Sequence, residues 1–192
     1  MSLKRENIVA FAERYRFLVK NKYRIRLHRH GLLRLIDLEV ESDSDSTSFQ
    51  NSIFLHNLIK SKAYQELFFD HFTQLSAGKH GPFIVNNISA QDYSLIERDH
   101  FLNEVIYTVS SPKWSCPPIS KKALTQVREL IDEICNGASV FFFLDKCRNF
   151  NSSSQEAIIY EHEWSHSLSS YYEYVAYDAV HKRLSLLVIT YE

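Results

Sequence analysis

The C-terminal third of the chain carries the pattern that most constrains the fold. Three segments there combine β-forming residues with an alternation of two faces, and short turn-like links separate them; they cover residues 157–168, 171–178 and 183–190. A period of two residues is typical of a β-strand. Because the links are too short for a crossover, neighbouring strands must run antiparallel. Together with the apolar segment 139–145, they predict a four-stranded antiparallel meander.

A helix is expected immediately before this meander. Ser120 is a favourable N-cap residue, and Asn136-Gly137 is a typical helix end. Apolar residues recur between them at helical spacing and define the face that should be buried: Leu124, Val127, Leu130, Ile131 and Ile134. The sequence therefore predicts a helix over 121–135 that packs on the meander, an α+β arrangement.

The N-terminal part predicts a helix over 5–19 followed by a β-hairpin that turns at His30-Gly31. That turn would place basic residues of the first strand opposite acidic residues of the second, in the pairs Lys20–Glu41, Lys22–Glu39 and Arg24–Asp37. It would also pair Tyr23 with Leu38 and Ile25 with Ile36. Such cross-strand pairs stabilise a hairpin. In this register the hairpin neutralises most of its own positive charge.

The middle of the chain gives weaker signals. Residues 51–75 carry a helical apolar stripe, either as one helix or as two with a break near Ser61. A short strand is expected at 83–87, a helix from a capping box at 89–98 and a strand at 104–109, with loops at 42–48, 113–118 and 149–154. The prediction is one α+β domain over 1–192, with N-terminal helix and hairpin, central helices, and the helix-covered meander. A candidate subdomain boundary lies at 112–118.

Composition narrows the function classes. The glycines form neither G-x-G-x-x-G nor a P-loop, which argues against nucleotide-dependent chemistry. Three cysteines without a C-x-x-C motif suit a reducing compartment, and no apolar run is long enough to span a membrane. We therefore expect a soluble cytoplasmic protein. Residues 1–36 hold ten Lys and Arg against two acidic residues, so nucleic-acid binding through the basic hairpin is kept as a weaker alternative.

One segment matches a catalytic motif. His162-Glu163-Trp164-Ser165-His166 reads H-E-x-x-H. On a helix this spacing brings two imidazole zinc ligands onto one face, with Glu163 as general base, as in zinc hydrolases. On a strand Glu163 points away from both histidines. The extended motif needs glycine and histidine where Ser169 and Tyr172 stand, so the strand is preferred, and a zinc metallohydrolase using His162, Glu163 and His166 remains the alternative.

The first functional hypothesis is a binding or interaction module without a catalytic centre or cofactor. Its contact surface would be the aromatic face of the meander, represented by Tyr160, Trp164, Tyr172 and Tyr174. Aromatic side chains supply large contact areas, so the partner would be a protein or a small molecule that stacks on rings. No membrane partner is expected. The oligomeric state is left open.

Overall fold

The centre of the molecule is a six-stranded antiparallel sheet with the strand order β1-β2-β8-β7-β6-β5. The computed structural model describes residues 15–42, 50–65, 78–110, 118–152 and 160–192. The strands of this sheet are β1 (Tyr15–His28), β2 (Gly31–Ser42), β5 (Tyr93–Ile96), β6 (Val140–Leu144), β7 (Ser170–Asp178) and β8 (Arg183–Tyr191). The fold is therefore α+β, as predicted.

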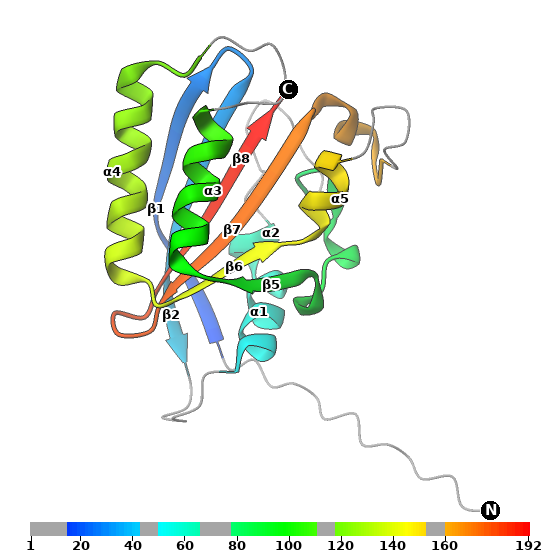
Figure 1. The fold of residues 1–192 in the computed structure, drawn as a ribbon. Helices are drawn as coiled ribbons and strands as arrows, with labels where there is room; N and C mark the ends of the chain where they lie inside the picture. The colour runs from blue at the N-terminus through cyan, green and yellow to red at the C-terminus, as the bar shows by residue number, and fades with distance from the viewer. Residues whose placement is uncertain (1–14, 43–49, 66–77, 111–117, 153–159) are drawn as a thin grey trace, which may run out of the picture.

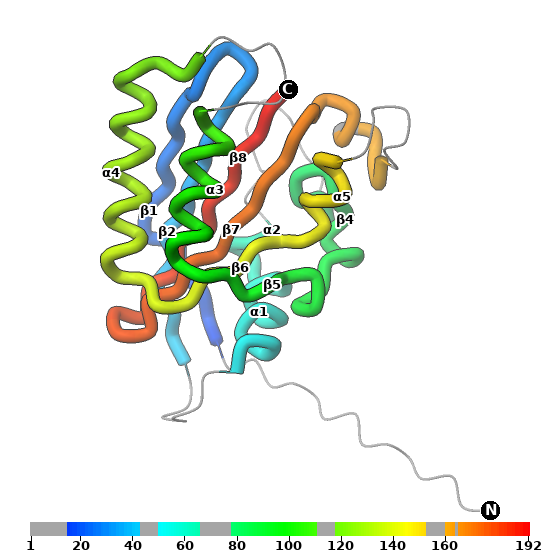
Figure 2. Tube along the Cα trace, in the orientation of Figure 1, coloured from blue at the N-terminus to red at the C-terminus, as the bar shows by residue number. Residues whose placement is uncertain are grey.

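Both faces of the sheet are covered. Helices α3 (Arg98–Ser110) and α4 (Lys121–Gly137) lie on one face (Figure 1). The other face carries α1 (Asn51–Lys60), α2 (Lys62–Gln65) and a small hairpin of β3 (Lys79–His80) and β4 (Phe83–Ile84) (Figure 2). The short helix α5 (Lys146–Ser152) follows β6 directly. Because layers lie on both sides, strands β7 and β8 bury nearly every side chain.

Helix α4 confirms its sequence prediction. The Ser120 hydroxyl accepts a hydrogen bond from the Ala123 amide at 3.1 Å, so it caps the first turn. Val127, Ile131 and Ile134 are buried, at the spacing that the pattern indicated. The local signals and the packing agree here, and the sequence alone was therefore sufficient.

Removal of this cap gives a first test. We expect Ser120→Ala to lower the free energy of unfolding by about 1 kcal/mol, since one amide of the first turn loses its acceptor. Thr125→Ala, at an exposed position within the same helix, is the control and should be neutral or slightly stabilising. Urea unfolding of both variants measures the difference, and equal losses would contradict the capping role.

The N-terminal hairpin is confirmed, but its predicted register is wrong. The chain turns at Arg29-His30, one residue early, and register shifts at Leu27 and at Lys20 each insert an extra residue into β1. The turn and the shift at Leu27 place Arg24 opposite Arg34 and Lys22 opposite Ile36, instead of opposite acidic residues. Among the ion pairs between described residues, Lys20 binds Glu39. Arg16 lies opposite Glu41, whereas Lys22 and Arg24 do not have the acidic cross-strand neighbours that the predicted register gave them.

The predicted N-terminal helix is wrong where it can be compared. Residues 15–19 begin strand β1, and the rings of Tyr15 and Phe17 pack edge-on against Phe54 of α1 at 5.3 and 5.6 Å. Their alternation buries them on one face of a strand, and this outweighs the helical spacing. The remainder of the predicted helix, 5–14, lies outside the described residues.

The meander prediction is correct in part. Strands β6, β7 and β8 are antiparallel neighbours as expected. The fourth predicted strand, 157–168, is wrong, because its described part contains the 3₁₀ helix η3 (Glu163–Ser167) and no strand. The sheet is completed by β5 on one edge and by the N-terminal hairpin on the other, where β2 pairs with β8.

Several smaller predictions also change. The break at Ser61 is confirmed, since α1 ends at Lys60 and α2 begins at Lys62, and the rest of the central helical segment lies outside the described residues. The segment 104–109 belongs to helix α3, because Phe101, Val105 and Val109 form a buried helical stripe. The capping box of Ser89 forms, but it opens a single 3₁₀ turn before β5 instead of a helix over 89–98. The expected loop at 149–154 begins inside α5.

Two observations concern the chain as a whole. Among the described helices, none is long and apolar enough to cross a membrane. The candidate boundary at 112–118 falls almost entirely outside the described residues, so it stays a prediction.

Candidate functional site

The H-E-x-x-H segment does not form the helix that a zinc hydrolase needs. Residues 163–167 are a single 3₁₀ helix, and His162 precedes it in extended conformation. The His162 Nε2 atom lies 3.0 Å from the Gly81 carbonyl oxygen, while the Glu163 carboxylate pairs with Lys79. Burial, followed by the nearby Lys79 charge, lowers the pKa of His162. These two side chains therefore contact different groups of the β3–β4 hairpin.

The second histidine of the motif, His166, contacts neither of these groups of the hairpin. The His166 ring stacks on the Tyr160 ring with centroids 3.8 Å apart. Among the described residues, no three His, Cys, Asp or Glu side chains lie close enough together to hold a metal ion. The described part of the chain thus does not assemble the predicted zinc centre from His162, Glu163 and His166.

Instead, this segment holds the β3–β4 hairpin in place. The Ser165 hydroxyl donates to the Pro82 carbonyl at 2.8 Å, and Glu161 accepts from the Ile84 amide at 2.7 Å. Lys146 approaches Glu161 at 2.9 Å. Burial raises the pKa of Glu161, but the hydrogen bonds from the Ile84 amide and Lys146 outweigh this, and the net pKa lies below the ordinary value. The segment therefore has a structural role that its sequence did not indicate.

The four predicted aromatic contact residues do not form one exposed surface. Tyr174 has no exposed area and packs between Phe101 of α3 and Phe143 of β6. This burial contradicts a surface position for Tyr174. Tyr172 and Tyr160 are half-buried, and the side chain of Trp164 lies outside what the structure describes. The sequence showed the aromatic stripe correctly, but it could not show that both faces of β7 are covered.

A buried polar cluster was missed by the sequence analysis. Glu173 of β7 has no exposed area, and its carboxylate binds four side chains from four different elements. His80 and the Tyr171 hydroxyl contact Oε2, both at 2.6 Å. The Tyr64 hydroxyl donates to Oε1 at 3.0 Å, and the Tyr93 hydroxyl donates to the same oxygen. A carboxylate in a buried strand needs such partners, but the partners are distant in sequence.

The geometry also fixes the protons of this cluster. His80 Nδ1 lies 3.1 Å from the Tyr64 carbonyl oxygen, which only accepts, so Nδ1 carries a proton. A second proton must lie between His80 Nε2 and the Glu173 carboxylate, and the pair is therefore neutral overall. Burial raises the pKa of Glu173, but the His80 charge and the hydrogen bonds from His80 and the tyrosines outweigh it, so that the pKa lies below its ordinary value.

This cluster is closed to solvent and holds the β3–β4 hairpin against the sheet; we call it the Glu173 lock. His80, Glu173, Tyr64 and Tyr171 all have no exposed area, and the His80 ring stacks on Tyr64 at 3.7 Å. A substrate cannot reach the carboxylate without displacing the β3–β4 hairpin. The cluster joins that hairpin to α2 and to the sheet, so its hydrogen bonds stabilise the packing of these elements.

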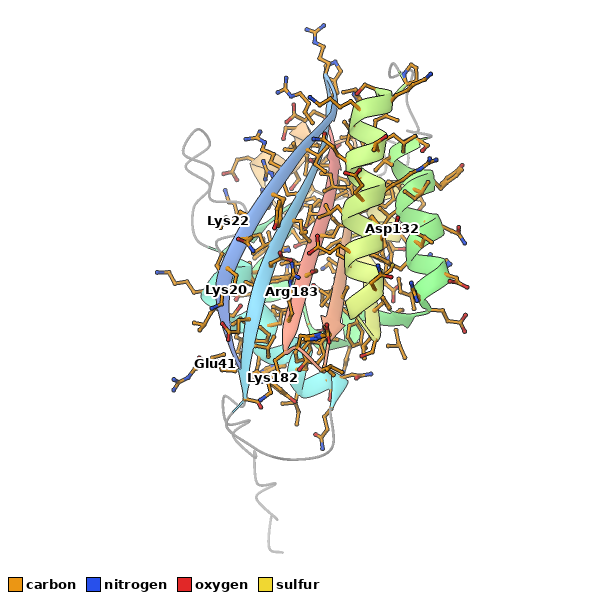
Figure 3. The ribbon with its side chains drawn as sticks, turned by 90° about the vertical axis from the view of Figure 1, so that its left-hand side faces the viewer. Lys20, Lys22, Glu41, Asp132, Lys182 and Arg183 are labelled. Carbon is orange, nitrogen blue, oxygen red and sulfur yellow. The ribbon has the colours of Figure 1, made fainter. Side chains whose placement is uncertain are left out.

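Strand β1 presents the opposite situation, an open and charged surface. It forms one edge of the sheet, and nine of its 14 residues are exposed. The strand carries five basic residues and no acidic one: Arg16, Lys20, Lys22, Arg24 and Arg26. Figure 3 shows Lys20 and Lys22 along this outer strand, on the side away from α4. Exposed apolar side chains lie between the basic ones, with Leu18 and Val19 exposed by 43% and 44% and Tyr23 by 40%.

The acidic residue that was expected to neutralise Arg24 is used elsewhere. Asp37 is buried, and it accepts hydrogen bonds from Arg183 at 2.7 Å and from the Ser185 hydroxyl at 3.0 Å. Arg183 also contacts Glu133 of α4, and Figure 3 labels it over strands β2 and β8. The hydrogen bond to Asp37 raises the pKa of Arg183. Asp37 therefore serves the junction of the sheet with α4.

A hollow lies beside the first residues of β1. It has a volume of about 340 Å³ between this strand and the end of α1. Its lining is basic and aromatic, and no acidic residue is among the described residues that form it: Tyr15, Arg16, Phe17, His56, Asn57, Lys60, Ser61 and Lys62. The hollow extends the positive surface of β1 toward α1 and α2. Strand and hollow together form the candidate site, which we call the basic edge.

Comparisons with protein-family models, with curated proteins and with solved structures found no match. The function is therefore inferred from the residues of the basic edge.

Proposed function

We propose that this protein is a non-catalytic binding module, and that the basic edge takes up a strongly acidic partner. The observation that carries the proposal is the composition of β1, an edge strand with five basic residues, no acidic residue and nine exposed positions. Exposed surfaces with one sign of charge attract oppositely charged partners and speed their association. We keep the hypothesis of an interaction module, but we now propose that its contact surface lies on the N-terminal hairpin and not on the meander.

The buried groups of the chain support a binding role over a catalytic one. The buried carboxylate–imidazole pair, Glu173 with His80, is sealed in the core. The motif histidine His162 and its neighbour Glu163 hold a hairpin through Gly81 and Lys79. These carboxylate and imidazole groups therefore have structural partners, which favours a binding role.

The charge of β1 is also unusual for the chain that contains it. The whole protein has a formal net charge of −1, so its basic residues are offset elsewhere in the molecule. Exposed charges act over about 10 Å at moderate salt, so a local cluster is felt by a partner even when the net charge is near zero. The partner should therefore be recognised at this edge and not by the overall charge.

A charge-reversal experiment tests the proposal. The double variant Lys22→Glu with Arg26→Glu should bind immobilised poly-L-glutamate about tenfold more weakly than the wild type at low salt, because two favourable contacts become repulsive. Lys121→Glu with Lys122→Glu, at exposed positions at the start of α4, changes the net charge equally and should bind nearly as the wild type does. Surface plasmon resonance over a salt series measures both.

Two results would overturn the proposal. One is wild-type protein that fails to bind poly-L-glutamate at low salt. The other is an equal loss of affinity in the two double variants, since binding would then follow net charge and would not be localised at β1. Melting curves of each variant show that both remain folded.

A further inference from the structure

We infer that the basic edge binds an extended acidic segment as an additional antiparallel or parallel strand, with Asn21–Arg26 as the pairing region. This inference rests on the proposed function and adds to it the class of partner and the way in which that partner is held. The partner is a peptide segment in which acidic and apolar residues alternate.

The backbone of β1 is the first reason. Among the described strands, β1 pairs with β2 alone, so the N–H and C=O groups on its outer side have no strand partner there. An unpaired edge of this kind is a template for another strand. At about 3.3 Å per residue, the 14 residues of β1 span roughly 46 Å. The opposite edge, β5, has only four residues and offers a much shorter template.

The bulge at Lys20 determines which side chains share a face. Before it, Tyr15 and Phe17 point toward α1. After it the alternation is reversed, since Asn21 is opposite Asp37, whose carboxylate faces α4 through Arg183. Tyr23 and Ile25 therefore lie on the α4 side of the sheet with Asn21. The basic residues of this stretch, Lys22, Arg24 and Arg26, lie together on the other side.

This arrangement specifies the partner. A strand added to β1 places its own side chains beside those of β1 on the same two faces. Acidic residues at alternate positions would then lie beside Lys22 and Arg26, and apolar residues between them would lie beside Tyr23 and Ile25. Opposite charges and apolar pairs in adjacent positions each stabilise a sheet by roughly 0.2–1 kcal/mol. A good fit to β1 therefore requires a partner in which acidic and apolar residues alternate, and not only one with negative charge.

The same charges argue against a second copy of this chain. Two β1 strands that paired edge to edge would bring five basic residues of one copy beside five of the other. Like charges at neighbouring positions destabilise a sheet. The edge is thus protected against self-association and remains available to an acidic segment.

A peptide probe separates this mode of binding from simple attraction between charges. The probe is a fluorescein-labelled peptide of alternating Glu and Val, about eight residues long. Two further versions carry N-methyl groups on all Glu or on all Val residues, so that each removes the amide donors of one edge and keeps every charge. Binding should depend only on the amide donors of the peptide edge that faces β1. Fluorescence anisotropy should show one methylated version weakened at least tenfold, and the other close to the unmodified peptide.

Hydrogen exchange gives an independent readout. On addition of the unmodified peptide, amides at alternate positions within Asn21–Arg26 should become protected, since only every second N–H of an edge strand points outward. Amides of β5 serve as the internal control and should not change. The double variant Lys22→Glu with Arg26→Glu should lose this protection.

The possible outcomes are distinguishable. Equal binding of all three peptides keeps the proposed function and overturns strand addition. Tighter binding of single-stranded oligothymidylate than of the unmodified peptide assigns the edge to nucleic acid and overturns the peptide partner. A dimer in solution with protection along β1 assigns the edge to a second copy. Failure to bind both the peptides and poly-L-glutamate removes the proposed function itself.

Discussion

Glu173→Gln is expected to lower the free energy of unfolding by about 3–5 kcal/mol, a large effect for a single polar substitution. The change removes the charge that balances the His80 proton and disturbs the acceptors of three tyrosine hydroxyls, in a buried cluster. The melting temperature should fall by roughly ten degrees, measured by circular dichroism. Glu129→Gln, at an exposed position of α4, is the matched control and should change little.

The effect should depend on pH in one direction. The folded-state pKa of Glu173 lies below the ordinary glutamate value, so its contribution is fully present above about pH 4.3 and is lost as the pH falls through the lowered value. The charged and titratable groups that face this carboxylate are His80, Tyr64, Tyr93, Tyr171 and Cys147. The difference in stability between wild type and Glu173→Gln should therefore be largest at neutral pH and shrink in acid. A difference that stays constant between pH 7 and about pH 3 would contradict the claim that the ionised Glu173 carboxylate stabilises the fold.

Gly81→Ala is expected to have the second largest effect. Gly81 adopts a positive φ of 57°, and a Cβ atom added there would overlap the ring of Tyr171. Tyr171 cannot move aside easily, because its hydroxyl is held by Glu173 and it has no exposed area. Overpacking and left-handed backbone strain together should cost about 2–4 kcal/mol.

Gly78 provides the matched control for this substitution. It also has a positive φ, 97°, but a Cβ atom there would meet no described atom within 4 Å. Gly78→Ala therefore carries only the backbone strain, about 1–2 kcal/mol. Chemical denaturation of the two variants isolates the clash as the difference between them. A larger loss in Gly78→Ala than in Gly81→Ala would show that the hairpin does not press on Tyr171.

Local signals predicted those elements whose packing agreed with them. The helix capped by Ser120 and strand β6 each have a pattern, a boundary and a buried face that point the same way. Helix α3 shows the limit of such signals. Its β-branched segment 104–109 resembles a strand in isolation, and the buried stripe appears only when Phe101 is included. Segment 157–168 alternates like a strand, but in its described part the side chains of His162 and Ser165 hydrogen-bond to the β3–β4 hairpin.

The candidate site required long-range information. The composition of the basic hairpin was visible in the sequence, but the turn at Arg29-His30 and the register shifts at Leu27 and Lys20 decide which residues face one another. A shift of this kind changes every cross-strand pair, and it separates Lys22 and Arg24 from the acidic residues that the predicted register placed opposite them. The Glu173 cluster could not be predicted either, since His80 lies in a different segment of the chain and nothing local marks it as the partner.

The pairing of β2 with β8 has a consequence for how the chain reaches its native state. These strands are central neighbours in the sheet, and Gly31 lies opposite Tyr191, so strands from the two ends of the described chain must meet before the sheet is complete. Loops of this length close slowly, and proteins dominated by distant contacts fold more slowly than those built from local ones. During synthesis the N-terminal hairpin must wait for the last strand, with one edge of β2 and its apolar face open. The solubility of that intermediate, and not only the stability of the finished fold, then depends on the lysines and arginines of β1.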